Sequence, residues 1–181
     1  HKAIGDQLTA IFVDHGMLNI INLIDGLDGL AAGISTIYFI TIAIIGFVLN
    51  SLGGLDVILA VIMIGSTMGF LVHNFPPAKI FMGDTGSLAL GGLITTLAVF
   101  TGLELYIPII GFVYVITAVS DIIQVLHYKR TKKRIFLMAP LHHHFQKKGV
   151  NESKIVTIYI ISTMIICLLT ITLILYFGGI V

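Results

Sequence analysis

Residues 74–87 read NFPPAKIFMGDTGS and form a polar stretch between two apolar runs, residues 55–72 and 88–101. The two adjacent prolines lack amide donors and resist helix formation, and the glycines on either side of Asp84 let the backbone turn sharply and approach a ligand closely. Each apolar run predicts a membrane-spanning helix. The stretch therefore predicts a loop that holds the Asp84 carboxylate at a membrane surface, and a carboxylate in that position favours a chemical role.

The composition excludes a water-soluble globular protein. Of the 181 residues, 57% are hydrophobic and only 10% are charged, and the mean hydropathy is +1.06. A chain of this size cannot bury that much apolar surface in its own core. The apolar runs are continuous rather than alternating, which favours helices over the strands of a membrane barrel. We therefore expect an all-α integral membrane protein, a polytopic helical bundle that forms a single transmembrane domain.

Apolar segments separated by turn residues and charged loops predict about six transmembrane helices. The segments are residues 8–24, 30–49, 55–72, 88–101, 105–126 and 155–177. The single cysteine, Cys167, lies in the last segment, so no intrachain disulfide can form. Gly65 and Gly69 have the four-residue spacing that permits close helix contact, and we expect them to pack against another helix.

The cations are concentrated in one loop. Seven of the ten Lys and Arg residues lie between Lys129 and Lys148, and the positive-inside rule places such a loop in the cytoplasm. Counting spans backward from it puts three polar loops on the cytoplasmic face, at residues 22–29, 73–87 and 127–153. A polar cytoplasmic substrate is therefore expected to meet a membrane-embedded site. The basic run before Ile135 is explained by topology and by attraction of anionic lipid alone.

A second motif precedes the second apolar segment. Asn22, Asp25 and Asp28 recur at three-residue intervals, so they share one face if the segment is helical. Paired carboxylates at a membrane edge suit a hydrated divalent cation, or the sugar and base of a nucleotide. The simpler alternative is a solvated turn, but ionisable residues at membrane depth are costly and usually functional.

The string FMGDTGS at residues 81–87 combines an aromatic ring, a carboxylate and hydroxyl groups at the start of the next helix. Such a combination can stack a base, hold Mg²⁺ and present helix N-terminal amides to phosphate. A plain helix cap explains one of these polar residues but not the whole string.

Three adjacent histidines, His142, His143 and His144, leave three alternatives: a transition-metal site, a phosphate-binding patch or a catalytic imidazole. Adjacent histidines cannot all point the same way in a regular element, which disfavours a metal site built from these three alone. A cationic anchor for an anionic substrate is the favoured interpretation. For Asp121 and Gln124, substrate contact and helix packing are equally favoured interpretations.

Three longer strings are specific enough to indicate a family. They are NLIDGLDGLAAG at residues 22–33, NFPPAKIFMGDTGSLALGG at 74–92 and MAPLHHHFQKKG at 138–149. In order and spacing they resemble the polyprenyl-phosphate N-acetylhexosamine-1-phosphate transferase superfamily, and the triple histidine resembles its bacterial branch that makes lipid I. The resemblance covers nearly the whole chain from about residue 19.

The resemblance implies a Mg²⁺-dependent phosphoglycosyl transferase of the bacterial cytoplasmic membrane. Members of this branch have ten transmembrane helices, and this chain resembles the last six. They transfer phospho-MurNAc-pentapeptide from its UDP carrier to undecaprenyl phosphate, which gives lipid I and UMP in peptidoglycan synthesis. UDP-MurNAc-pentapeptide, undecaprenyl phosphate and membrane lipid are the implied partners, nucleic acid is not one, and a homodimer is left open.

The family's functional residues carry over at matching positions. Asp84 is implied as the Mg²⁺ ligand, with Asp25 and His143 as further catalytic residues. The implied substrate-binding residues are Asn74, Gly26, Leu27, Asp28 and Phe81 in a uridine pocket, Asn22 beside the metal and nucleotide, and Gln124, His142 and His144 at the sugar, phosphate and peptide part.

The sequence also departs from the family pattern. The paired aspartates and a uridine-pocket lysine that the family carries upstream are absent from these residues, so the chain alone is expected to be inactive. The string IDGLDGLAAG is closer to the GlcNAc-1-phosphate branch, and Thr117 stands where the lipid I branch usually has glutamate. A UDP-GlcNAc transferase and a catalytically dead membrane fragment therefore stay open, whereas polar motifs gathered on one face disfavour a transporter.

Overall fold

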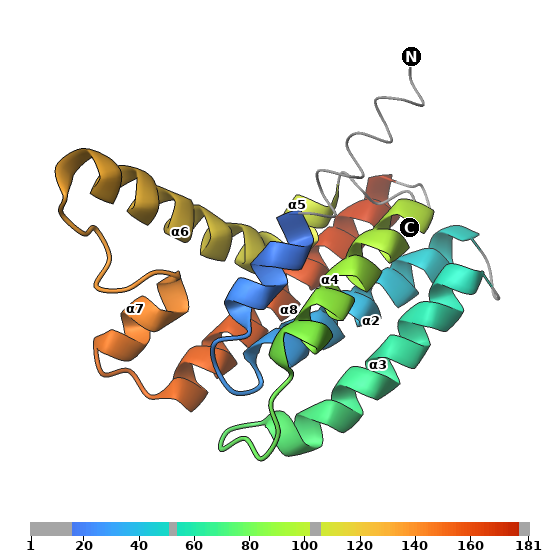
Figure 1. Cartoon of the computed structure of the whole chain (residues 1–181). Coiled ribbons are helices and arrows are strands. Elements are labelled where there is room, and N and C mark those ends of the chain that lie inside the picture. The colour runs from blue at the N-terminus through green and yellow to red at the C-terminus, as the bar shows by residue number, and fades with distance from the viewer. Residues whose placement is uncertain (1–15, 51–53, 102–105, 178–181) are drawn as a thin grey trace.

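A computed structural model describes residues 16–50, 54–101 and 106–177, and within these residues every regular element is a helix (Figure 1). Residues 16–24 are helical and lead into the labelled helices. These are α2 (Leu30–Asn50), α3 (Leu55–Asn74), α4 (Gly83–Phe100), α5 (Ile107–Ile110), α6 (Phe112–Thr131), α7 (Leu141–Lys147) and α8 (Glu152–Phe177). The expected all-α architecture is confirmed.

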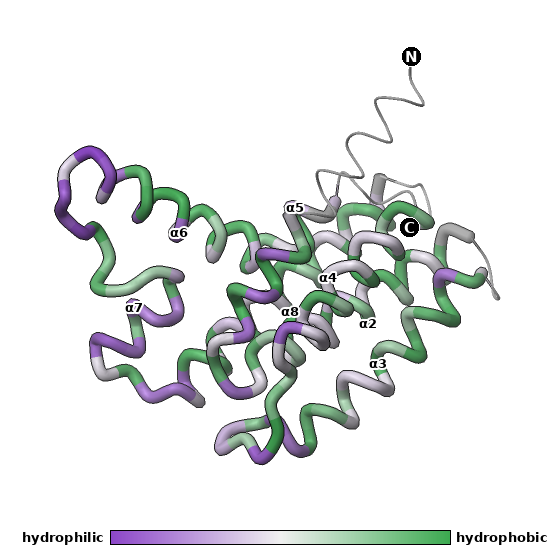
Figure 2. The backbone as a smooth tube through the Cα atoms, in the orientation of Figure 1, coloured by the Kyte–Doolittle hydropathy of each residue, from purple (hydrophilic) through white to green (hydrophobic). Residues whose placement is uncertain are grey.

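Four of the described helices are long and apolar enough to cross a membrane. The candidate spans are Leu30–Val48, Leu55–Asn74, Gly83–Phe100 and Glu152–Tyr176. They form the green body of the tube in Figure 2, and the hydrophilic residues gather in the loops and at the far end of α6. The structure is thus a polytopic helical membrane fragment. The first expected span, residues 8–24, lies only partly within the described residues.

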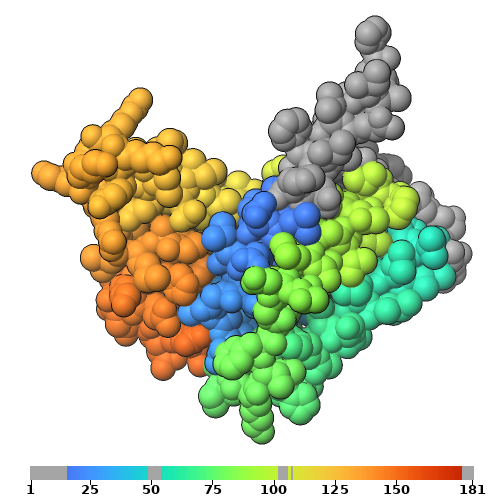
Figure 3. Space-filling model, viewed as in Figure 1, coloured from blue at the N-terminus to red at the C-terminus, as the bar shows by residue number. Residues whose placement is uncertain are grey.

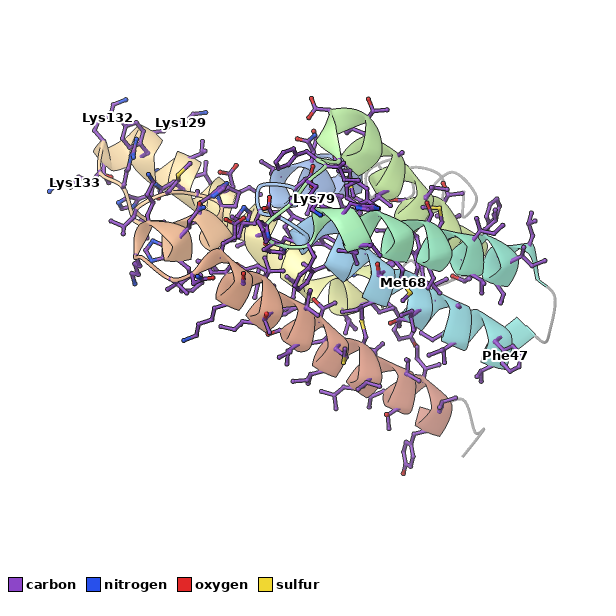
Figure 4. All side chains as sticks on the ribbon, turned by 90° about the horizontal axis from the view of Figure 1, so that it is seen from below. Phe47, Met68, Lys79, Lys129, Lys132 and Lys133 are labelled. Atoms are coloured by element: carbon purple, nitrogen blue, oxygen red, sulfur yellow. The ribbon has the colours of Figure 1, made fainter. Side chains whose placement is uncertain are left out.

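Helix α2 is the centre of the bundle. Of its spanning window 67% is buried inside the protein, against 17–39% for the other three spans, and it contacts α3, α4 and α8. Its side chains supply much of the core, including Ile34, Tyr38, Phe39 and Ile42, each fully buried. The other spans leave apolar side chains exposed, as Met68 on α3 illustrates in Figure 4. In a membrane this exposed surface contacts lipid.

Hydroxyl groups link α2 to its neighbours inside the core. The Ser35 hydroxyl lies 2.9 Å from the Tyr114 hydroxyl of α6, and Thr36 donates to the Thr67 hydroxyl of α3 at 2.8 Å. Such contacts between helices within a bilayer contribute about 0.6–2 kcal/mol each. They fix which faces of the apolar helices meet, because apolar packing alone specifies rotation weakly.

Small residues bring α4 against the helix at residues 16–24. Ser87, Gly91 and Thr95 are buried and follow one another at four-residue intervals along α4. A Cβ added to Gly91 would lie 2.8 Å from the Cα atom of Leu18 and 3.2 Å from the carbonyl oxygen of Met17. Glycine is therefore required here for the close approach of two backbones.

The small residues expected to pack in α3 behave differently. A Cβ added at either Gly65 or Gly69 would meet nothing within 4 Å among the described residues. The prediction of close helix contact at this pair is wrong for this part of the chain. The four-residue spacing alone cannot say which face of a helix has a neighbour.

Three element boundaries differ from the expected ones. The segment expected as one span at residues 105–126 is divided into α5 and α6 at Gly111, whose backbone leaves the helical region at φ −89° and ψ 24°. Helix α4 starts at Gly83 rather than near residue 88, so Asp84 lies in its first turn and the polar loop is shorter. The basic loop also contains a short helix, α7.

The first two polar loops meet at one end of the bundle, and α7 and the start of α8 from the third loop lie toward the same end, whereas the far end of α6 projects away (Figure 1). The turn at residues 25–29 is hydrogen-bonded to Asn74 and Ala78 of the second loop, and Asp28 is also bonded to Glu152 at the start of α8. His142 and His143 of α7 lie against Gly26 of the same turn. The fold therefore brings segments about 120 residues apart in sequence into one polar region.

Replacing Gly91 by alanine tests the helix contact at residues 16–24. The added methyl group would meet backbone atoms that cannot move independently, so we expect a loss of about 1–3 kcal/mol in the free energy of unfolding. Thermal unfolding of the purified chain in detergent, followed by circular dichroism, measures the change.

Gly65→Ala is the matched control, because its new methyl group has open space. Alanine favours a helix over glycine by about 1 kcal/mol, so this variant should be as stable as the parent or more stable. Equal effects of the two substitutions would contradict the packing described for Gly91.

Candidate active site at the convergence of the polar loops

A cavity of about 260 Å³ lies where the first two polar loops meet. Its lining combines carboxylates, amides, glycines and one aromatic ring. The lining residues are Asn22, Asp25, Gly26, Leu27, Asp28, Asn74, Phe81, Met82, Gly83 and Asp84. Eight of these ten positions were expected at the site from sequence. Of the other two, Gly83 was expected only as a glycine that lets the backbone turn beside Asp84, and Met82 was not singled out, because nothing in its residue type marks a wall position.

Asn74 joins the two loops. Its side chain is 4% exposed. Its Oδ1 accepts a hydrogen bond from the Gly29 amide at 3.0 Å, and its Nδ2 donates to the carbonyl oxygen of Ile80 at 2.8 Å. Gly29 has φ +75°, a conformation that L side chains rarely adopt. One buried side-chain amide thus connects the turn that contains Gly29 to the polar loop.

Asp28 makes a second connection between the loops. The Ala78 amide donates to its Oδ2 at 2.8 Å, and its own amide donates to Oε1 of Glu152 at 2.9 Å. Charge-assisted hydrogen bonds of this kind are about twice as strong as neutral ones. Glu152 was not predicted from sequence, since a single acidic residue in the first turn of a helix carries no signal beyond a favourable helix dipole.

Asp25 and Asp84 place two carboxyl groups in the same cavity. Burial, and to a smaller extent the negative charge of Asp84, together raise the pKa of Asp25 to about 6. Asn22 donates from Nδ2 to Asp84 Oδ1 at 2.9 Å and to the Ser87 hydroxyl at 3.1 Å. The Asn22 amide thereby orients the Asp84 carboxylate, which is itself exposed.

His142 and His143 reach this region from α7. A Cβ added to Gly26 would lie 2.7 Å from Nε2 of His143 and 3.1 Å from Nε2 of His142. His142 is fully buried and its two ring nitrogens have no hydrogen-bond partner among the described residues. Burial and the adjacent His143 lower the pKa of His142 to about 3, so His142 is neutral at physiological pH.

Gln124 and His144 do not line the cavity at Asp84. The Gln124 side chain accepts from the amides of Ile135 and Phe136 and donates to the Phe136 carbonyl oxygen, at 3.0–3.1 Å. Nδ1 of His144 accepts from the Leu137 amide at 3.0 Å. Both side chains therefore hold the segment before α7. Their expected contacts with substrate stay predictions.

The donor set of the cavity is compatible with Mg²⁺. Within residues 16–50, 54–101 and 106–177, no group of three or more His, Cys, Asp or Glu residues is arranged to hold a metal ion. Mg²⁺, however, is commonly bound through one or two carboxylates together with substrate phosphates and water. Asp25 and Asp84 supply two carboxyl groups whose mutual repulsion a cation would relieve.

Comparison with known proteins identifies the family of this chain. The family model described as "Glycosyl transferase family 4" matches residues 4–102, which include the first two polar loops and all ten residues that line the cavity at Asp84. This match covers more than half of the chain.

Two curated relatives that match this chain are both named phospho-N-acetylmuramoyl-pentapeptide-transferase. The relative from Staphylococcus haemolyticus is 50% identical over 151 residues, covering 82% of this chain and 46% of the relative. The one from Caldanaerobacter subterraneus is 47% identical over 159 residues, covering 86% of this chain and 49% of the relative. The chain spans about half the length of the relatives it matches. On the family match, the chain belongs to glycosyl transferase family 4.

Proposed function

We propose that this chain is part of a Mg²⁺-dependent enzyme that transfers phospho-MurNAc-pentapeptide from its UDP carrier to undecaprenyl phosphate, giving lipid I and UMP. The observation that carries the proposal is the single cavity that gathers Asn22, Asp25, Asp28, Phe81 and Asp84. The relatives named phospho-N-acetylmuramoyl-pentapeptide-transferase support this substrate over UDP-GlcNAc. The proposal puts the polar loops on the cytoplasmic side, where the basic loop belongs by the positive-inside rule.

The cavity suits the uridine end of the donor. At about 260 Å³ it is slightly smaller than typical small-molecule sites of about 300–1,000 Å³, so it can hold a nucleoside while the sugar and peptide extend outside. Phe81 is 76% exposed at the wall of the cavity. Its ring is available to stack on the uracil base, and an aromatic stack contributes about 1–3 kcal/mol.

The Asp25 and Asp84 carboxylates are the proposed cation ligands. Bound there, Mg²⁺ would supply Lewis-acid stabilisation of the pyrophosphate that is being cleaved. Asn22 keeps the Asp84 carboxylate oriented through the 2.9 Å hydrogen bond. Pre-orientation of this kind lowers the reorganisation required during phosphoryl transfer.

His143 is the proposed proton carrier next to the cavity. Its Nδ1 lies 3.1 Å from Oε1 of Gln146. When Nδ1 donates to that oxygen, the neutral ring leaves Nε2, which lies close to Gly26, as an acceptor. His143 can then take up a proton and offer positive charge to a phosphate. His142 packs beside it, with ring centroids 4.4 Å apart, and fixes its position.

Asp84→Asn tests the metal-ligand assignment in a complete enzyme that carries this segment. Loss of one carboxylate charge should lower Mg²⁺-dependent release of UMP by at least about 100-fold, as expected for loss of a group that stabilises transition-state charge. UMP release from UDP-MurNAc-pentapeptide in the presence of undecaprenyl phosphate measures the effect.

Thr85→Val is the control for that experiment. Thr85 is the next residue, is exposed, and does not line the cavity, so the variant should keep the parent rate. Near-normal turnover by Asp84→Asn would show that Asp84 is not the essential ligand.

Asp25→Asn tests the two-carboxylate arrangement by its pH dependence. The folded state raises the pKa of Asp25 from 3.8 to about 6, so it binds the proton more tightly than the unfolded state, and stability falls as pH rises through this window. The variant removes this penalty. Its thermal midpoint should exceed that of the parent by about 2–4 °C at pH 8, corresponding to roughly 1 kcal/mol, and should match the parent below pH 4.

The control variant is Asp84→Asn, which should stabilise the chain at pH 8 by a smaller amount. Its charge is the second cause of the raised pKa, after burial. Added Mg²⁺ should stabilise the parent chain more than either variant. Identical midpoints for parent and Asp25→Asn at both pH values would exclude a buried, repelled carboxyl group at this position.

A further inference from the structure

A second and larger cavity lies in the segment that projects from the bundle. We call α6, α7 and the residues between them, 112–147, the basic arm (Figures 1 and 3). The cavity has a volume of about 650 Å³ and lies between the last three turns of α6 and residues 134–147. It shares no lining residue with the cavity at Asp84.

Three cations line this cavity. Lys129 comes from α6, Arg134 from the following segment and Lys147 from the last turn of α7, and Asp121 is the one carboxylate among the lining residues. The excess of positive charge favours an anion. Arginine presents a planar fork of donors that suits phosphate, and lysine adds a compact charge. Figure 4 shows Lys129, Lys132 and Lys133 at the same end of the arm, far from Lys79.

The same cavity has an apolar wall. Val125, Leu137 and Met138 line it, and their side chains are 43%, 54% and 39% exposed. Ile122 and Leu126 on α6 are 56% and 58% exposed. Cations above exposed aliphatic side chains are typical of segments that lie at the boundary between lipid headgroups and acyl chains.

We infer that the cavity of the basic arm binds the phosphate headgroup of an anionic glycerophospholipid from the surrounding membrane. The charged residues contact the phosphate, and the apolar wall contacts the start of the acyl chains. Basic pockets beside membrane helices on the cytoplasmic side bind lipid headgroups in this way. Gln124, an expected substrate contact, also lines this cavity, but the residues that line the cavity at Asp84 do not, and lipid binding here does not depend on the proposed function.

Neighbouring residues in the chain provide a charge-matched test. The pocket variant is Arg134→Gln with Lys147→Gln. The control is Lys133→Gln with Lys148→Gln, which removes the same charge from exposed residues that do not line the cavity. Native mass spectrometry of the chain in detergent, titrated with phosphatidylglycerol or with zwitterionic phosphatidylcholine, gives the fraction of chain with bound lipid.

The pocket variant should weaken phosphatidylglycerol binding at least 10-fold, and the control should weaken it less than 3-fold. Phosphatidylcholine should bind the parent chain at least 10-fold more weakly than phosphatidylglycerol. If both double variants lost phosphatidylglycerol binding equally, the lipid would be attracted by diffuse charge and the proposed site would be wrong. The proposal would also be wrong if neither double variant lost binding.

Two competitors distinguish the sources of phosphate. Glycerol 3-phosphate should fail to displace phosphatidylglycerol at equal concentration, since it lacks the acyl chains. Displacement by it would assign the cavity to a soluble phosphate. Undecaprenyl phosphate should displace phosphatidylglycerol no better than phosphatidylglycerol itself does, and stronger displacement would assign the cavity to the carrier lipid.

Circular dichroism checks the fold of each variant. If the pocket variant does not fold, Lys129→Gln replaces it and is expected to weaken phosphatidylglycerol binding in the same direction.

Discussion

The buried side chain of Asn74 is the contact on which the polar end of the molecule depends. It is the last residue of α3 and reaches both the amide of Gly29 and the carbonyl oxygen of Ile80. Leaving a buried amide unpaired costs about 1–3 kcal/mol, so the turn, the end of α3 and the polar loop are stable only in this arrangement. Asp28 and Glu152 then attach the start of α8 to the same turn. The cavity at Asp84 exists because these connections hold its walls.

The two carboxyl groups in the cavity, Asp25 and Asp84, make it favourable for a cation. Asp25 is half-buried, and Asp84 lies close enough to raise its pKa, so the apo site carries unfavourable repulsion. Groups that repel one another without a ligand are stabilised by a cation or by a cationic side chain. In the proposed enzyme the same repulsion would favour Mg²⁺ binding and thus couple metal binding to the pH at which Asp25 ionises.

The sequence was sufficient to predict the helical membrane fold and most of the cavity lining, because both depend on local signals. Long uncharged runs specify spans, and polar residues between them, such as Asp25 and Asp84, mark the membrane surface. Contacts set by tertiary structure were not predictable. The bond from Asp28 to Glu152 joins residues 124 positions apart, and the pairing of Gly91 with Leu18 depends on helix rotation. The break at Gly111 was signalled by Pro108 and Gly111, but continuous hydrophobicity favoured a single span.

The central claim is that the cavity between the first two polar loops binds a uridine nucleotide together with a divalent cation. The most direct measurement is a crystal structure of the complete enzyme with UMP and Mn²⁺, using the anomalous signal of manganese. The account predicts an anomalous peak within about 2.0–2.3 Å of an Asp84 carboxylate oxygen and the uracil ring against Phe81. A manganese peak away from Asp84 and Asp25, or the nucleotide in the basic arm among Lys129, Arg134 and Lys147, would contradict it.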